Sequence, residues 1–126
     1  MQEELQHHID TIIAAAQALI SRQDGELSDR QEQFVRAILT NAEQFIHLAT
    51  RFIAEPPAYV SDDLRHELSN PLTPMYGYSE LLMKRTMETL TPAQRQHVVT
   101  ISQSTDELRR IVEYLLKRGR SAAASS

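Results

Sequence analysis

The sequence carries the same helix-start signal twice, once in each half of the chain. Each copy places a hydroxyl residue three positions before a glutamine, and the two copies are Leu27-Ser28-Asp29-Arg30-Gln31 and Leu90-Thr91-Pro92-Ala93-Gln94. In such a capping box the hydroxyl oxygen accepts a hydrogen bond from one unpaired backbone amide, and the glutamine side chain accepts one from another. Pro92 stands at the first helical position, where its missing N–H group is harmless. A helix is therefore predicted to begin at each box.

The apolar residues on both sides of the boxes repeat with the same spacing. We call the shift along the chain that takes Ser28 to Thr91 the repeat offset. Without a gap, the repeat offset pairs Leu5 with Leu68, Leu19 with Leu82, Val35 with Val98, Ile38 with Ile101 and Phe45 with Leu108. Any two amphipathic hairpins align in part, but coincident caps and equal lengths do not follow from amphipathicity alone. The chain is therefore predicted to be a tandem repeat of one helical hairpin.

Helical periodicity and its interruptions predict four helices. Apolar residues spaced three and four apart form one stripe in each of the segments 3–23, 28–53, 61–87 and 92–119. Gly25 is suited to a left-handed cap at the end of the first segment.

The segments outside these helices are expected to be irregular. Between the second and third helices, the prolines of Glu55-Pro56-Pro57-Ala58 exclude a helical connection. Ser61, with two aspartates after it, caps the third helix. The small residues Ser121-Ala122-Ala123-Ala124-Ser125-Ser126 are expected to form a frayed tail or the start of a linker.

These elements predict an all-α protein, an antiparallel four-helix bundle made of two repeated helical hairpins. A length of 126 residues suffices for one domain with its own core. The expected single bundle, residues 1–126, consists of hairpin one at 3–53, a connector at 54–60, hairpin two at 61–118 and a tail at 119–126.

Composition excludes several classes of function. The count of 0 cysteines rules out disulfides and thiolate chemistry, and is compatible with a reducing cytoplasm. The net charge of -4 gives no general attraction to nucleic acid or anionic lipid. No apolar run approaches the roughly 20 residues that span a bilayer, and no signal peptide opens the chain. A soluble, cytoplasmic protein without membrane insertion and without a nucleic-acid partner is expected.

One stretch, Arg65-His66-Glu67-Leu68-Ser69-Asn70-Pro71-Leu72, combines an exposed titratable group with a broken structural rule. His66 lies two residues before Leu68, about 200° around the helix from the apolar stripe, and is therefore expected to face solvent. Pro71 inside a helix removes one backbone hydrogen bond and costs about 3 kcal/mol. A local rule broken beside a titratable residue indicates a functional site.

The same stretch resembles a known family. The run His66-Glu67-Leu68-Ser69-Asn70-Pro71-Leu72-Thr73, continued by Gly77-Tyr78-Ser79-Glu80-Leu81-Leu82, is similar to the phosphoacceptor motif of the histidine-kinase dimerisation and phosphoacceptor (HisKA-type) domain. Leu90-Thr91-Pro92 and the stripe Leu108, Ile111 and Leu115 look like the second helix of that family. The resemblance covers about residues 60–118 and implies that His66 carries the phosphoryl group.

The resemblance also bears on assembly. The family ordinarily builds a four-helix bundle from two chains, whereas here one chain supplies both hairpins, so a monomeric pseudo-dimer is expected. The repeat offset sets Glu3 opposite His66, His7 opposite Asn70 and His8 opposite Pro71. The first copy is therefore expected to be degenerate, keeping the core and lacking the site.

Phosphoryl transfer mainly needs positioning and charge balance. An unperturbed imidazole, with a pKa of about 6.5, is mostly neutral at pH 7 and can attack phosphorus. The resemblance implies that Glu67 accepts or orients the imidazole proton. Asn70, one turn after His66, is placed to hold a phosphate oxygen or a water, and Pro71 loosens the helix beneath.

Three functions stay open at this point. The chain can be a histidine phosphotransfer protein of a two-component phosphorelay, whose partner is a response-regulator receiver domain. It can be the phosphoacceptor fragment of a sensor histidine kinase, or a non-catalytic module that docks a receiver or a kinase. Met1 and the degenerate first copy favour the first over the second. No Gly-rich loop, Walker-type motif or ATP-domain box occurs in the sequence, so the chain is not expected to bind ATP in the manner of the family. A histidine kinase or a separate ATP-binding domain is therefore a further partner to consider, and the direction of phosphate flow stays open.

No metal or other cofactor is expected. His66-Glu67 opens a zincin-like H-E-x-x-H pattern, but Asn70 replaces its second histidine. Adjacent His7 and His8 point about 100° apart on a helix and do not share a ligand site. The remaining predictions are surface positions for His7, His8, His47 and His97, core positions for Met75, Met83 and Met87, and packing roles for Tyr76 and Tyr78.

Overall fold

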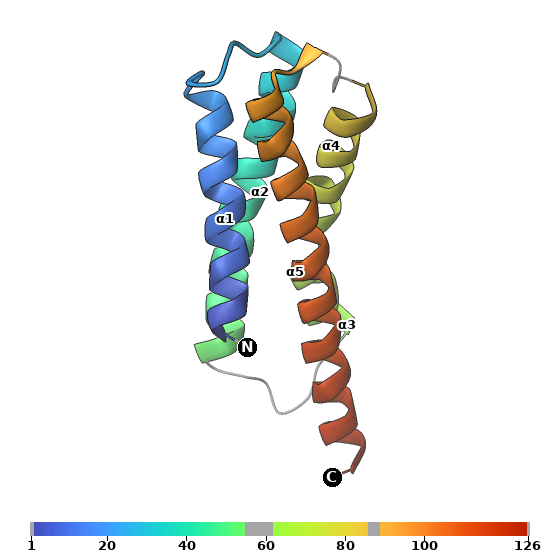
Figure 1. The fold of residues 1–126 in the computed structure, drawn as a ribbon. Helices are drawn as coiled ribbons and strands as arrows, with labels where there is room; N and C mark the ends of the chain where they lie inside the picture. The colour runs from blue at the N-terminus through green and yellow to red at the C-terminus, as the bar shows by residue number, and fades with distance from the viewer. Residues whose placement is uncertain (1, 55–61, 86–88, 126) are drawn as a thin grey trace.

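The computed structural model describes residues 2–54, 62–85 and 89–125, and the regular elements in these ranges are all helical. The helices are α1 (Gln2–Ile20), α2 (Asp29–Ala54), α3 (Asp62–Ser69), α4 (Leu72–Arg85) and α5 (Pro92–Ser125). α3 and α4 follow one another along one edge of the molecule and share a single position in an antiparallel four-helix bundle (Figure 1). The predicted all-α bundle is confirmed.

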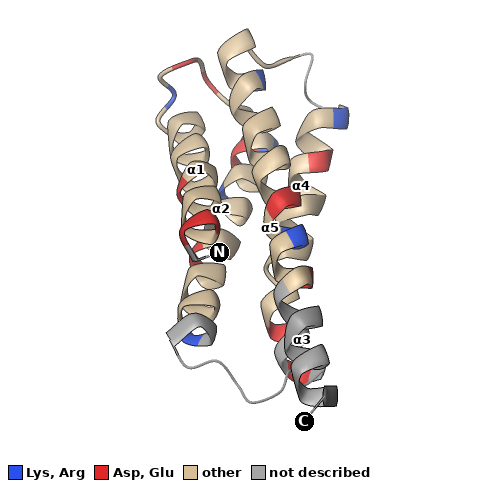
Figure 2. Ribbon diagram, turned by 60° about the horizontal axis from the view of Figure 1, so that its bottom comes forward, with Lys and Arg blue, Asp and Glu red and all other residues tan. Residues whose placement is uncertain are grey.

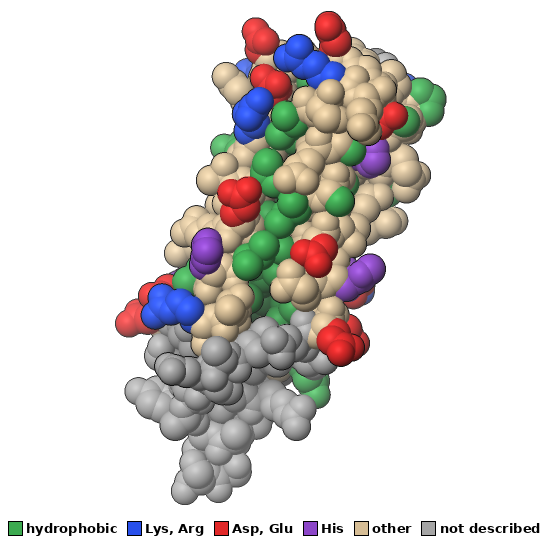
Figure 3. Space-filling model, turned by 90° about the vertical axis from the view of Figure 1, so that its left-hand side faces the viewer, with side chains coloured by type: hydrophobic (Ala, Val, Ile, Leu, Met, Phe, Trp, Pro, Cys, Tyr) green, Lys and Arg blue, Asp and Glu red, His purple; other side chains and the backbone are tan. Residues whose placement is uncertain are grey.

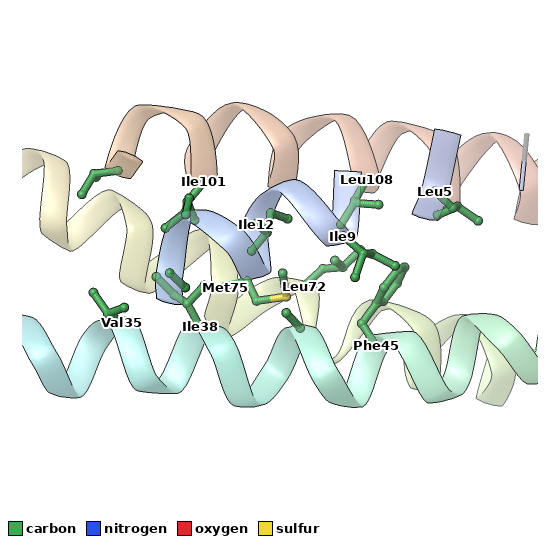
Figure 4. Close-up of a cluster of buried hydrophobic side chains, with 14 of the residues drawn as sticks. Leu5, Ile9, Ile12, Val35, Ile38, Phe45, Leu72, Met75, Ile101 and Leu108 are labelled. Atoms are coloured by element: carbon green, nitrogen blue, oxygen red, sulfur yellow. The ribbon is translucent and has the colours of Figure 1, made fainter. Parts of the chain in front are cut away.

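Each long helix packs against two neighbours. α1 contacts α2 and α5, and α4 contacts the same two helices. Their apolar stripes meet along the bundle axis (Figure 4), where Ile12, Phe45, Met75 and Leu108 are all 0% exposed. Burial of a large apolar side chain stabilises a fold by about 1.5–3 kcal/mol. The helical spacing in the sequence therefore identified the core directly.

Both predicted capping boxes form. Ser28 N–H donates to Gln31 Oε1 at 2.8 Å, and Gln31 N–H donates to Ser28 Oγ at 3.1 Å. In the second box, Thr91 N–H donates to Gln94 Oε1 at 2.9 Å, and Gln94 N–H donates to Thr91 Oγ1 at 3.2 Å. α2 and α5 begin directly after these hydroxyl residues.

The turn after α1 differs from the predicted one. The helix ends at Ile20 instead of residue 23, and the left-handed residue after it is Arg22, with a φ of 64°. Gly25 has a φ of 135°, and a Cβ there would lie 3.1 Å from Gln94 Nε2. Glycine is favoured here both by this φ, which residues with a side chain rarely adopt, and by the close approach of the turn to the second capping box. Neither reason is a helix cap.

The third predicted helix is divided in two. α3 ends at Ser69 and α4 begins at Leu72, whereas the sequence predicted one helix running through Pro71. The pyrrolidine ring has no N–H to donate and clashes with the preceding turn, and here it ends the helix instead of bending it.

The C-terminal helix is longer than predicted. α5 continues past Gly119 to Ser125, so the expectation of an irregular tail is wrong over residues 119–125. A single glycine costs a helix only about 1 kcal/mol, and the alanines at 122–124 favour the helical state. The predicted connector at Glu55-Pro56-Pro57-Ala58, the cap at Ser61 and the core position of Met87 lie outside the described residues.

One hydroxyl in the core has no hydrogen-bond partner among the described residues. The Thr105 side-chain oxygen is buried, and the residue is 0% exposed. Valine has the same shape without the hydroxyl, and an unpaired buried polar group costs about 1–3 kcal/mol. We expect Thr105→Val to raise the free energy of unfolding by about 1 kcal/mol in urea denaturation. Thr40→Val, at an exposed position of α2, should change it by less than about 0.5 kcal/mol. A loss of stability in Thr105→Val would contradict this account.

Candidate functional site

The histidine indicated by the sequence lies in the last turn of α3. His66 is exposed, and its ring makes no hydrogen bond or ion pair with a described residue. Leu68, across the helix, is 3% exposed and packs in the core. The helix is therefore anchored through Leu68 and presents the imidazole to solvent.

The other predicted site residues lie at the same junction of α3 and α4. Glu67 and Asn70 are exposed, whereas Pro71 is buried. Asn70 follows His66 by one turn and shares its face, and Glu67 is offset by about 100°. Solvent thus has access to three of the four residues, and the fourth packs inward beneath them.

The break at Pro71 changes the backbone beneath the imidazole. Asn70 N–H donates to His66 O at 2.8 Å, so the turn that carries the histidine keeps its helical hydrogen bond. In an unbroken helix the next bond would run from residue 71 to the carbonyl of Glu67, and proline cannot donate it. His66 is thus held by a regular helical turn, and α3 ends at the end of that turn, at Ser69.

A groove of about 290 Å³ adjoins the site between the α3–α4 edge and α5. Its lining residues are Ser69, Leu72, Thr73, Tyr76, Arg109, Val112 and Glu113. Ser69 follows His66 by one turn in α3, and Thr73 and Tyr76 of α4 line the same groove as Ser69. His66 and the groove therefore lie on one side of the bundle.

An arginine and a tyrosine from different helices meet in this groove. The Arg109 guanidinium lies 4.7 Å from the centroid of the Tyr76 ring, and its Nη1 is 3.8 Å from Asp106 Oδ1. Tyr76 is 37% exposed and does not have the predicted packing role, whereas Tyr78 does pack, with its ring 5.4 Å from that of Phe34. The sequence did not single out Arg109, because only the fold brings α5 to this edge.

The other histidines take no part in this site. His97 is half-buried, with its Nε2 3.0 Å from Asp24 Oδ2, and so makes a tertiary contact instead of the predicted surface position. His7 and His47 are exposed, and the rings of His7 and His8 meet edge-on at 5.5 Å. Within the described ranges, no group of three or more acidic or histidine side chains is arranged to hold a metal ion.

Acidic and basic positions are interspersed along the helices instead of gathering by sign (Figure 2). Several charged residues form ion pairs with a residue of the same helix. Lys84 pairs with Glu80 at 3.0 Å in α4, and Arg110 pairs with Asp106 at 3.1 Å in α5. Exposed pairs of this kind stabilise a helix by less than about 1 kcal/mol. Among the described helices, none has the length and apolar character to cross a membrane.

Comparison with known proteins bears on the same half of the chain. The family model described as His Kinase A (phospho-acceptor) domain matches residues 59–123, which is just over half of the sequence and contains the whole stretch around His66. No curated protein and no solved structure matches the chain.

Proposed function

This chain belongs to the His Kinase A (phospho-acceptor) domain family, and on that premise we propose that His66 exchanges a phosphoryl group with a response-regulator receiver domain. Membership makes the chain a histidine phosphoacceptor and dimerisation module of two-component systems. The observation that carries the finer proposal is the exposed imidazole of His66, unengaged by any described residue, at the histidine position of the matched motif.

The proposed step is a single in-line displacement at phosphorus. A neutral ring nitrogen of His66 forms the N–P bond while the P–O bond to the receiver's aspartate breaks, and the aspartate leaves as a carboxylate. The other ring nitrogen still carries its proton, which passes to Glu67 or to water and leaves a neutral ring. The Asn70 amide group donates to a phosphoryl oxygen, which offsets part of its charge.

The exposure of the ring meets the geometric demand of this step. In-line transfer needs the phosphorus and the attacking nitrogen about 3 to 3.5 Å apart, so a domain carrying the aspartyl phosphate must approach the ring closely. Glu67 and Asn70 flank the ring without covering it. An acceptor buried in the bundle could not meet this demand.

The adjoining groove supplies the docking surface for the receiver. Arg109 presents a planar fork of N–H donors over the Tyr76 ring, and Glu113 offers a carboxylate on the same wall. A partner seated there contacts both charges and reaches His66 with the same face.

Two alternatives use the same residues. A sensor-kinase fragment would take its phosphate from an ATP-binding domain instead of a receiver. A docking module without chemistry would bind the groove and leave His66 unmodified. The phosphate source and the modified residue therefore separate the three functions.

Intact-mass spectrometry after incubation with phosphorylated receiver domains, and separately with candidate kinases and ATP, tests the proposal. The expected result is one acid-labile phosphoryl group per chain, transferred from a receiver and mapped to His66. Binding of a receiver without any transfer would favour the docking module, and transfer only from a kinase would favour the sensor-kinase fragment.

The 126-residue chain should not phosphorylate itself. Its sequence lacks the phosphate-binding loops and boxes that position ATP, so no group is available to hold the donor and its magnesium ion. Incubation with radiolabelled ATP and Mg²⁺ alone should leave the chain unlabelled. Label on His66 without an added kinase would contradict this prediction.

A further inference from the structure

Two hydrogen bonds between the hairpins form a reciprocal pair. Gln31 Nε2 donates to Thr89 Oγ1 at 2.8 Å, and Gln94 Nε2 donates to Glu26 O at 3.3 Å. The repeat offset takes Gln31 to Gln94, and it also takes Glu26 to Thr89. Reciprocal contacts of this kind are what a two-fold axis creates between identical subunits.

Helix packing and burial are also related by the repeat offset. Across the hairpins α1 contacts α5 as α4 contacts α2, and within them α1 contacts α2 as α4 contacts α5. Buried residues occur in equivalent pairs, which include Leu5 and Leu68, Ile12 and Met75, Leu19 and Leu82, Gln31 and Gln94, Val35 and Val98, and Phe45 and Leu108. Gln31 and Gln94 are buried at equivalent positions of the two hairpins. Amphipathicity does not explain this, because it requires only apolar residues at buried positions.

The hairpins differ where the phosphoacceptor lies. The repeat offset places Glu4 at the position of Glu67 but Glu3 at the position of His66. α1 is also continuous through the region equivalent to the break between α3 and α4. The first hairpin therefore has the surrounding pattern without the residue that forms the N–P bond.

The groove beside the acceptor also changes in the first hairpin. The positions equivalent to Tyr76 and Arg109 are Ile13 and Ile46, partly buried residues packed against the core. Apolar side chains run along the face formed by α1 and α2 (Figure 3). A partner that recognises the arginine and tyrosine on one side of the bundle finds neither on the other.

From these observations we propose that the first hairpin is a duplicated copy of the phosphoacceptor hairpin. It fills the pairing face of that hairpin, which is the side on which α4 contacts α2 and α5 contacts α1. The chain then works as a monomer with one acceptor and one partner-binding groove. The partner for that pairing face is thus residues 2–54 of the same chain. The contacts between the hairpins support the statement that the pairing face is filled. The statement that each chain has one acceptor rests on the proposed function.

Covalent attachment strengthens this arrangement. A tethered hairpin is present at an effective concentration of about the millimolar range. A second chain must therefore displace the attached hairpin before it can use the same face. A second chain at a concentration below the millimolar range does not displace it.

Sedimentation equilibrium of the full chain, alone and with a receiver domain, tests the assembly. The expected molar mass is that of one chain, 14.4 kDa, at every concentration below the millimolar range, with one receiver bound per chain. A dimer of the chain, or two receivers per chain, would overturn the inference. If the chain is a monomer and intact-mass analysis finds no phosphoryl group on His66, the proposed function fails and the paired hairpins stand.

Exchange of equivalent core residues tests the duplication itself. Phe45 and Leu108 are equivalent and both 0% exposed. Phe45→Leu and Leu108→Phe should each lower Tm, and the double variant should regain most of the loss, because it returns the same two side chains to equivalent sites. The matched control combines Phe45→Leu with Leu72→Phe, whose equivalent is Ile9, and should regain nothing. Equal Tm values for the two double variants would overturn the equivalence.

Discussion

Replacing His66 by glutamine should abolish acid-labile phosphorylation and leave the fold intact. Glutamine has no ring nitrogen that can form an N–P bond, so the loss should be complete instead of partial. His66 is exposed and unengaged by any described residue, so the free energy of unfolding should change by less than about 0.5 kcal/mol. Intact-mass spectrometry after incubation with a phosphorylated receiver measures the first quantity, and urea denaturation measures the second.

The matched control for this variant lies in the first hairpin. Glu3→Gln changes the position equivalent to His66, which is also exposed. It should leave both the phosphoryl content and the stability unchanged, because the reacting nitrogen is on the other side of the bundle. If the His66→Gln chain still takes up phosphate from a receiver, His66 is not the acceptor, and the docking-module alternative replaces the proposal.

The largest effect on stability is expected for Phe45→Ala. Phe45 is 0% exposed at the centre of the bundle (Figure 4), and truncation of a buried phenylalanine costs about 3–5 kcal/mol. Since a domain of this size is stable by only about 5–15 kcal/mol, the variant should unfold at much lower urea concentration and temperature. Circular dichroism at the helical minimum during urea and thermal denaturation measures the change.

Tyr114→Ala provides the control for a loss of aromatic area without a cavity. Tyr114 is 51% exposed on α5, so its truncation should change the free energy of unfolding by less than about 0.5 kcal/mol. Similar losses in the two variants would show that the buried stripe of α2 does not hold the bundle together.

Local rules of helix periodicity and capping were sufficient to predict much of the fold. Apolar side chains at helical spacing, such as Ile12 and Ile38, are buried because one face of each helix must leave water. Both capping boxes form because their hydrogen bonds join residues only three apart, such as Ser28 and Gln31. The exposed position of His66 follows from its angle to Leu68 on one helix.

Other features required contacts between distant parts of the chain. Gly25 lies against Gln94, and Asp24 pairs with His97, because the turn after α1 packs on the start of α5. The sequence predicted the left-handed cap at Gly25, but Arg22 adopts it.

In the candidate site, too, some features follow from the sequence alone and others only from the tertiary structure. The sequence by itself determined the positions of His66, Glu67 and Asn70 relative to one another, because they lie within about one helical turn and α-helix geometry sets their spacing. Only the tertiary structure placed Arg109 and Glu113 across the groove from Ser69 and so extended the surface beside His66. Those residues meet because antiparallel packing of α4 and α5 brings together segments that no local periodicity relates.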